Sequence, residues 1–115
     1  MKLFIDTTQN TKSIVRVGDV EIIKTYDSPR GQDVLRHIEE ALKKAHVKKE
    51  SLKEVEVNPG PGAFTSTRVG VAVANAFAFS LKIPVNGGKP GEFVKPVYDN
   101  QPSISLPKSQ FDKSK

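Results

Sequence analysis

The residue types best suited to chemistry fall in two short stretches, Asp6-Thr7-Thr8 and Pro59-Gly60-Pro61-Gly62. The second stretch precedes an apolar segment expected to be helical, and Gly-rich turns before helix N-termini can bind anions. It is not a phosphate-binding P-loop, because no Gly-Lys-Ser or Gly-Lys-Thr follows it. Each stretch also has a structural interpretation. The first would end a strand and bond its side chains to local backbone N–H groups, and the second would be a stiff turn with Gly60 or Gly62 at positive φ.

Isolated ionisable side chains give weaker signals. Arg68 falls in the first turn of the expected helix, where the helix dipole disfavours a cation, so an acid of a partner, a phosphate, an acid of the same chain or solvent must compensate it. His37 and His46 are nine residues apart without a carboxylate at ligand spacing, and both are predicted on the surface. The absence of cysteine excludes disulfides, thiolate zinc sites and cysteine nucleophiles. The sequence therefore predicts no catalytic set and no metal site.

A group of lysines occupies the middle of the chain, diluted by Glu50 and Glu54: Lys43, Lys44, Lys48, Lys49 and Lys53. A solvated charged face is one interpretation, and contact with an RNA backbone is the other. The formal net charge is +5, a mild bias that permits nucleic-acid binding without requiring it.

The elements that must position these residues follow from the hydrophobic pattern, and a length of 115 residues suits one domain. Strands are predicted over residues 2–5 and, as a hairpin around Gly18-Asp19, over residues 13–17 and 20–26. After a break at residues 28–31, the pattern predicts an amphipathic helix over 32–45, a strand over 54–57, a helix over 65–81 with Thr65 or Ser66 near its N-cap, and a strand over 83–85. The fold is therefore predicted to be α/β with a mixed sheet.

The predicted helix over residues 65–81 is the strongest physical signal in the chain. Apolar residues occur on all its sides, and a helix that is apolar all round must be covered all round. A chain this short has one core and covers one face well, so a partner is predicted to cover the other; burial within the chain alone is the alternative. The predicted interface residues of the two helices are Val34, Leu35, Ile38, Leu42, Arg68, Val69, Ala72, Val73, Ala76, Phe77 and Ser80.

The remaining segments are predicted to carry little regular structure. Residues 86–92 would form a flexible bridge, residues 93–98 an extended segment and residues 99–115 a flexible tail. No run of about 20 apolar residues is present, so no membrane-spanning helix is predicted. An acid follows the N-terminus too early for a signal peptide, and a cytoplasmic protein is predicted.

Several of these motifs together resemble the TsaB (YeaZ) family. The matching residues are Ile5-Asp6-Thr7-Thr8, the block Asn58-Pro59-Gly60-Pro61-Gly62-Ala63-Phe64-Thr65, then Thr67-Arg68-Val69-Gly70 and Ile83-Pro84-Val85. They cover residues 3–86 in the family's order, and the GPGxFT-x-x-R-x-G block is the most specific of them. The later Lys95-Pro96-Val97-Tyr98 resembles the P-x-Y segment that closes many members.

The resemblance implies a single lobe of the actin-like or ribonuclease-H-like superfamily. Residues 1–86 would be the N-terminal lobe, and residues 87–98 a linker with a terminal extended segment in place of most of the family's second lobe. The implied role is a non-catalytic scaffold in bacterial synthesis of tRNA threonylcarbamoyladenosine, bound to a TsaD-like catalytic subunit through the two helices. A TsaE-like ATPase, a homodimer of the same surface and tRNA contact through the complex are further implied. The chain would hold no cofactor itself, with ATP or ADP only in the complex.

Two alternative functions stay open. Active members of the superfamily use an aspartate and a hydroxyl-rich turn near metal-bound phosphate. A small nucleotide- or phosphate-binding enzyme would use Asp6, Thr7 and Thr8 with Gly60 and Gly62. One lobe offers only an open shelf for phosphate, which favours the structural interpretation of these residues. The other alternative is a homodimeric module whose lysines bind RNA.

Overall fold

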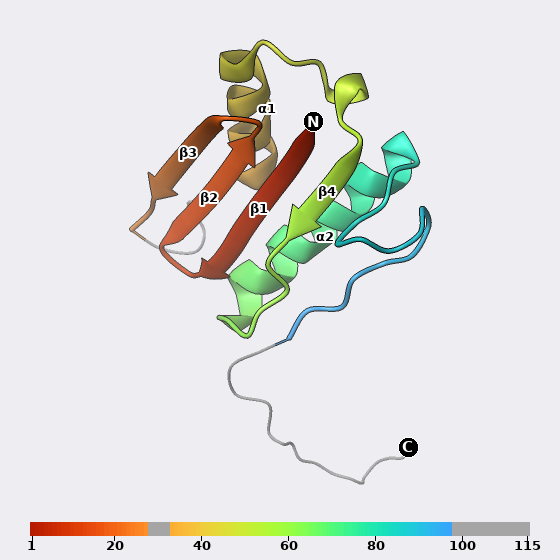
Figure 1. The fold of residues 1–115 in the computed structure, drawn as a ribbon. Helices are drawn as coiled ribbons and strands as arrows, with labels where there is room; N and C mark the ends of the chain where they lie inside the picture. The colour runs from red at the N-terminus through yellow and green to blue at the C-terminus, as the bar shows by residue number, and fades with distance from the viewer. Residues whose placement is uncertain (28–32, 98–115) are drawn as a thin grey trace, which may run out of the picture.

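The structure, a computed structural model, describes residues 1–27 and 33–97. Figure 1 shows two layers, a sheet and two main helices behind it. Along the chain the elements are β1 (Lys2–Gln9), β2 (Lys12–Val17), β3 (Val20–Thr25), α1 (Val34–Ala45), the short 3-10 helix η2 (Lys49–Ser51), β4 (Glu54–Val57) and α2 (Phe64–Leu81). The predicted α/β class, hairpin and two main helices are thereby confirmed.

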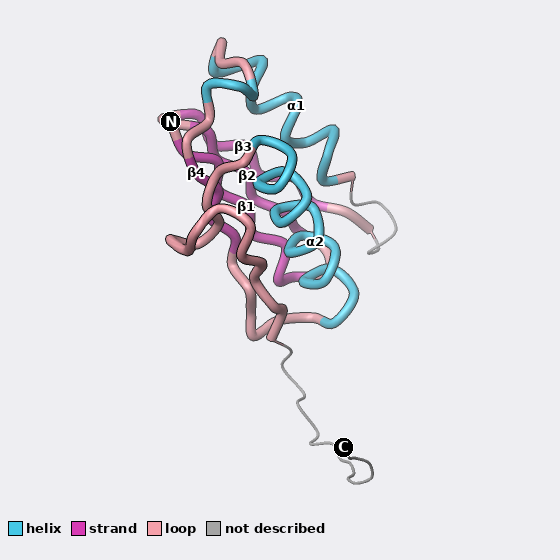
Figure 2. Tube along the Cα trace, turned by 90° about the vertical axis from the view of Figure 1, so that its right-hand side faces the viewer, coloured by secondary structure: helices cyan, strands magenta, loops and turns pink. Residues whose placement is uncertain are grey.

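The sheet is mixed, as predicted, with the strand order β3-β2-β1-β4. β1 pairs antiparallel with β2 and parallel with β4, and β2 pairs antiparallel with β3. Alternate side chains of the two central strands point toward the helices and are fully buried: Leu3, Ile5, Val15 and Val17. Figure 2 shows α1 and α2 on the same side of the sheet, so no described helix covers the opposite side.

The core lies between the sheet and the inner sides of the two helices. α1 buries apolar side chains at the three- and four-residue spacing of its sequence pattern, and all but Ala41 are large: Val34, Ile38, Ala41 and Leu42. α2 buries smaller residues, chiefly Gly70, Val71, Ala74 and Ala78. The small residues let the backbone of α2 approach the sheet closely.

The first strand is longer than its sequence pattern suggested. β1 continues through Asp6 and Thr8 to Gln9, with a register irregularity between Asp6 and Gln9. These residues therefore lie within a strand and not in the turn that ends it. The cause is the partner strand, because β2 continues to pair as far as Lys12.

The start of α2 and the last strand also differ from their predictions. The N-cap of α2 is Ala63, and neither Thr65 nor Ser66 caps the helix. The N–H of Ala63 donates to the backbone oxygen of Thr8 (2.8 Å), so pairing with the end of β1 fixes the helix start in place of a capping side chain. The predicted strand over residues 83–85 is reduced to one parallel bridge from Val85 to β4.

After α2, the chain turns back along the helix. The Asn75 side chain donates from Nδ2 to Val94 O and accepts from Val94 N, both at 2.9 Å. The Phe93 ring packs edge-on against Phe79, with ring centroids 6.0 Å apart. This strap, residues 93–97, forms no regular strand, and it covers part of the outer surface of α2 (blue in Figure 1).

Some predictions fall outside the described residues. They concern the break at 28–31, the first residue of the predicted first helix, the end of the predicted extended segment at residue 98, and the tail over 99–115. Within the described ranges, no helix has both the length and the apolar character needed to cross a membrane.

Candidate functional site

The outer side of α2 and the neighbouring α1 form an apolar groove. Its volume is about 440 Å³. One lining residue comes from α1 and five from α2, and none is charged: Leu35, Ala72, Val73, Ala76, Phe77 and Ser80. All six belong to the interface set predicted from the sequence. We call this surface the helix groove.

A close contact with β1 sets which side of α2 faces outward. Gly70 lies against Thr7, and a Cβ at position 70 would overlap the Thr7 hydroxyl. That hydroxyl donates to the backbone oxygen of Ser66 (2.6 Å), one turn earlier in the helix. Ala72 and Ala76 lie roughly 200° and 240° around the helix from Gly70, so they point away from the sheet. The contact between Gly70 and Thr7 thus places Ala72 and Ala76 on the outer side of α2.

Three predicted interface residues are placed elsewhere by the structure. Val34, Ile38 and Leu42 are buried in the core of the chain itself, so their prediction as partner contacts is corrected. The physical reason is that α1 has a single apolar stripe, and the sheet already covers it. Their apolar character reflects folding of the chain itself.

The last two predicted interface residues, Arg68 and Val69, are exposed on α2. The Arg68 guanidinium lies over the Phe64 ring, 5.7 Å from its centroid. Among the described residues Arg68 forms no ion pair. The aromatic face offers the cation a favourable electrostatic contact that the helix N-terminus does not.

The structure brings together the two stretches singled out for phosphate chemistry. Asp6 Oδ1 accepts from the backbone N–H (3.0 Å) and the hydroxyl (2.8 Å) of Thr8, and Asp6 Oδ2 accepts from Asn58 Nδ2 (3.1 Å). Gly60 has a φ of 110°, and Gly62 lies directly against Thr8. Both carboxylate oxygens of Asp6 are therefore bonded within the chain. This supports a structural role for the two stretches.

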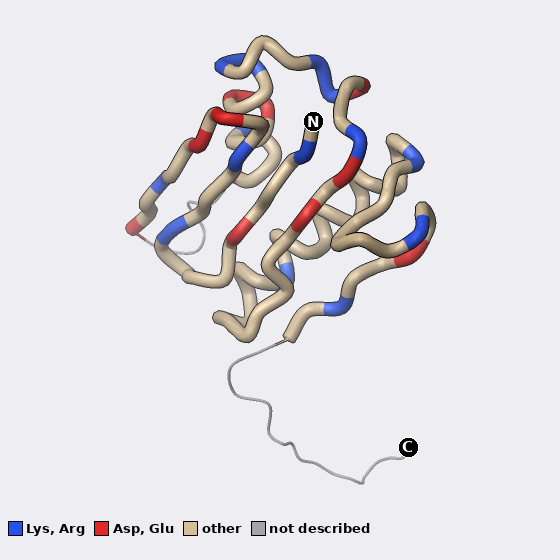
Figure 3. Tube along the Cα trace, in the orientation of Figure 1, with Lys and Arg blue, Asp and Glu red and all other residues tan. Residues whose placement is uncertain are grey.

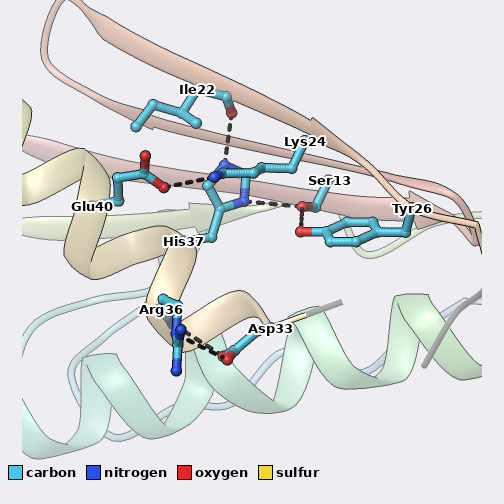
Figure 4. Close-up of polar contacts among 8 residues, drawn as sticks. All are labelled: Ser13, Ile22, Lys24, Tyr26, Asp33, Arg36, His37 and Glu40. Atoms are coloured by element: carbon cyan, nitrogen blue, oxygen red, sulfur yellow. Dashed lines mark hydrogen bonds and ion pairs between the residues drawn. The ribbon is translucent and has the colours of Figure 1, made fainter. Parts of the chain in front are cut away.

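A buried polar cluster between the hairpin and α1 was missed by sequence reasoning. His37 is only 2% exposed, so its prediction as a surface residue is wrong. Figure 4 shows its ring against the sheet: Nε2–H donates to Ile22 O (3.0 Å), while Nδ1 and the Tyr26 hydroxyl each lie 2.9 Å from Ser13 Oγ. The signal was present, because position 37 lies three residues after Val34 on the apolar stripe.

This cluster is structural in its chemistry. Burial lowers the pKa of His37, and the nearby charge of Lys24 lowers it further, while the bond to Ile22 O and the charge of Glu40 oppose the change. Ser13 is fully buried, so no substrate reaches it as a nucleophile. Across residues 1–27 and 33–97, no group of three or more His, Asp or Glu side chains could hold a metal ion.

Comparisons with known proteins converge on one group. A family model described as TsaD, tRNA N6-adenosine threonylcarbamoyltransferase, matches residues 31–87. YeaZ from Pseudomonas aeruginosa is similar in structure, with a TM-score of 0.60 and 26% identity over 73% of this chain and 42% of that chain. An uncharacterized protein with similarity to peptidase YeaZ, also from Pseudomonas aeruginosa, has a TM-score of 0.60 and 26% identity over 73% of this chain and 40% of that chain.

The comparisons also define how far the likeness extends. No curated protein sequence matches the chain. The chain spans about two fifths of the length of the two solved structures. Those structures have the actin-like, ribonuclease-H-like architecture, so the predicted fold class is confirmed.

Proposed function

We propose that the chain, which is similar to YeaZ in structure and matches the TsaD family model, is a one-lobe member of the YeaZ (TsaB) family and acts in the synthesis of threonylcarbamoyladenosine on tRNA. In this role it is a scaffold subunit that performs no catalysis. It binds a TsaD-like catalytic subunit through the helix groove and thereby supports that subunit's activity.

The exposed groove is the observation that carries this proposal. Its lining includes the small residues Ala72 and Ala76, which let a partner helix approach closely. Leu35 is 56% exposed at its edge, an unusual position for a large apolar side chain with no cover. A partner helix with apolar residues on one side would fill the groove and remove this surface from water.

The polar residues support a non-catalytic role for the chain. Asp6 is bonded to Thr8 and Asn58, and His37 is bonded to Ile22 within the core. These groups hold β1, β4 and α1 in place. We therefore propose that any ATP or ADP is bound by other subunits of the complex.

Light scattering on the purified chain, alone and mixed with the TsaD-like subunit of the same organism, tests the docking. We expect a complex at micromolar concentration, and a homodimer of the chain alone that the catalytic subunit displaces. Ala76→Asp places a carboxylate in the groove and should abolish both associations, because an unpaired buried charge is costly. Thr25→Asp, an exposed change at the end of β3, is the matched control and should leave both intact. Absence of any complex with the unaltered chain would overturn the docking.

A reconstituted modification assay separates the scaffold role from the enzyme alternative. Threonylcarbamoylation of tRNA by the other subunits should stop when this chain is left out and should fall with Ala76→Asp. Titration calorimetry of the isolated chain with ATP or ADP should give no heat of binding. Nucleotide binding that is lost in Asp6→Asn would instead favour a phosphate-binding enzyme.

A further inference from the structure

The connector between α1 and β4 concentrates positive charge at one end of the molecule. Its lysines are all exposed, and the first two of them belong to the last turn of α1: Lys43, Lys44, Lys48, Lys49 and Lys53. Five lysines against two glutamates leave residues 43–54 with a net charge of +3. Figure 3 shows these cations near the upper edge of the fold, beyond the ends of the strands. We call this surface the lysine connector.

The backbone of the lysine connector is held in place. His46, which is exposed as predicted, ends α1 in the left-handed conformation, and its N–H bonds back to the last turn of the helix. Val47 N donates to Leu42 O (3.0 Å), and Lys53 N donates to Met1 O (2.9 Å). Leu52 is buried in the core. The lysine side chains therefore project from a fixed scaffold, so binding a ligand costs little backbone entropy.

No ion pair within the described residues includes a charge of the connector, although the charge of Lys44 is near enough to Glu40 to help lower the pKa of that carboxyl. Among the described residues the ion pairs of the chain are Lys2–Glu56, Arg16–Glu21, Lys24–Glu40 and Arg36–Asp33, and none includes a connector lysine. The two glutamates of this stretch, Glu50 and Glu54, also form no ion pair within the described residues. The cations are thus available to an external polyanion.

We propose that the lysine connector binds the phosphate backbone of RNA. Its apolar side chains Val47 and Leu52 are turned inward, so it offers neither an insert for a lipid bilayer nor an anchor for a protein interface. It contains no Phe, Tyr or Trp on which a base could stack. Recognition is therefore electrostatic, through phosphates, and independent of base sequence.

The lysine connector and the helix groove are compatible on one molecule. α1 contributes Leu35 to the groove from its first turn and ends at Lys43 and Lys44 in its last turn. A partner helix seated in the groove leaves the connector exposed. This inference rests on the proposed function for the identity of the RNA, a tRNA, and it gives the scaffold a share in holding that substrate.

Fluorescence anisotropy of a labelled tRNA transcript with the full chain, at several salt concentrations, tests the inference. Affinity should fall steeply with salt, with a slope of about 0.7–0.9 per phosphate contact. Lys48→Gln combined with Lys49→Gln should lower the slope by about 1.5 and weaken binding about 30-fold near 0.1 M salt. Lys89→Gln combined with Lys95→Gln removes the same charge outside the connector and should change affinity less than about twofold.

Each outcome decides between clear alternatives. Equal tRNA affinity of the two double variants would overturn the inference, as would binding to anionic phosphatidylserine vesicles without binding to tRNA. Docking to the TsaD-like subunit is measured separately on the same proteins, and the Lys48 and Lys49 variant should retain it. If the unaltered chain does not bind the TsaD-like subunit, the proposed function is overturned. The tRNA titration would still show whether the lysine connector binds RNA.

Discussion

The two main helices of the chain pack on the same side of one sheet, yet their outer sides differ. α1 presents charged residues to solvent, among them Arg36, Glu39 and Lys43. α2 presents alanine, valine and phenylalanine, and one flank of it is covered by the strap. Apart from Leu35, which lines the helix groove, the outer side of α1 is charged and is hydrated by water. The outer side of α2 has apolar surface left over, which is why we place the partner there.

The inner sides of the helices differ as well. α1 fills space with Ile38 and Leu42, whereas α2 brings Gly70 and Ala74 to the sheet. Stability at α1 therefore depends on large side chains that fill the core. Stability at α2 depends on the absence of a side chain at Gly70, where the helix backbone approaches the sheet. The four predictions below test this contrast, beginning with the largest effect on stability.

Removing volume from the inner side of α1 should have the largest effect. Ile38 is fully buried, and Ile38→Ala should lower the free energy of unfolding by about 2–5 kcal/mol. Leu35→Ala, on the exposed side of the same helix, should cost about 0.5 kcal/mol. Urea denaturation of both variants measures the difference. Equal losses would show that Leu35 is packed within the isolated chain.

Adding volume to the inner side of α2 should have the next largest effect. Alanine is a better helix former than glycine by about 1 kcal/mol, so an unconstrained Gly70→Ala would be stabilising. The new Cβ would overlap Thr7, and we expect a loss of about 1–3 kcal/mol instead. Thr7→Ala in the same chain removes the overlapping hydroxyl and methyl groups, and should recover part of that loss. A double-mutant cycle in urea reports this coupling, and strict additivity would contradict it.

Acid should weaken the attachment of α1 to the hairpin. The folded-state pKa of His37 lies below its ordinary value of 6.5, so the unfolded chain binds the proton more readily. Stability is therefore complete above about pH 6.5 and falls as pH drops below it, by at most about 1.4 kcal/mol per pH unit. The groups facing His37 include Lys24, Tyr26 and Glu40.

The measurement is the unfolding free energy between pH 7 and 5, above the range in which the carboxylates titrate. His37→Gln should remove this dependence, whereas His46→Gln, at an exposed position, should preserve it. A slope that survives His37→Gln would assign the proton to another group.

The contrast between the helices also explains how much of the fold the sequence could predict. The pattern of α1 identifies one inner side, and period-two alternation identifies the inner side of each central strand. The pattern of α2 is apolar all round, so it does not show which side of the helix faces the sheet. That rotation depends on the contact of Gly70 with Thr7, residues 63 positions apart, and local patterns carry no such information.

The candidate site divides in the same way. Six of the eleven predicted interface residues line the helix groove, five of them from the apolar and small residues of α2 and one, Leu35, from α1. Val34, Ile38 and Leu42 were assigned to the interface because the pattern shows which residues are apolar but not what covers them. His37 was misplaced for the opposite reason: its polarity outweighed its position on the buried stripe.

The smallest effect on stability is expected on the outer side of α2. Val69 is 41% exposed, and Val69→Ser exchanges two residues of similar helix propensity, so the unfolding free energy should change by less than about 0.5 kcal/mol. The same change removes apolar surface beside the helix groove and should weaken self-association measured by light scattering. A clear loss of stability without a change in association would mean that the isolated chain already covers this side of α2. The contrast with α1 would then disappear, because both outer sides would be complete without a partner.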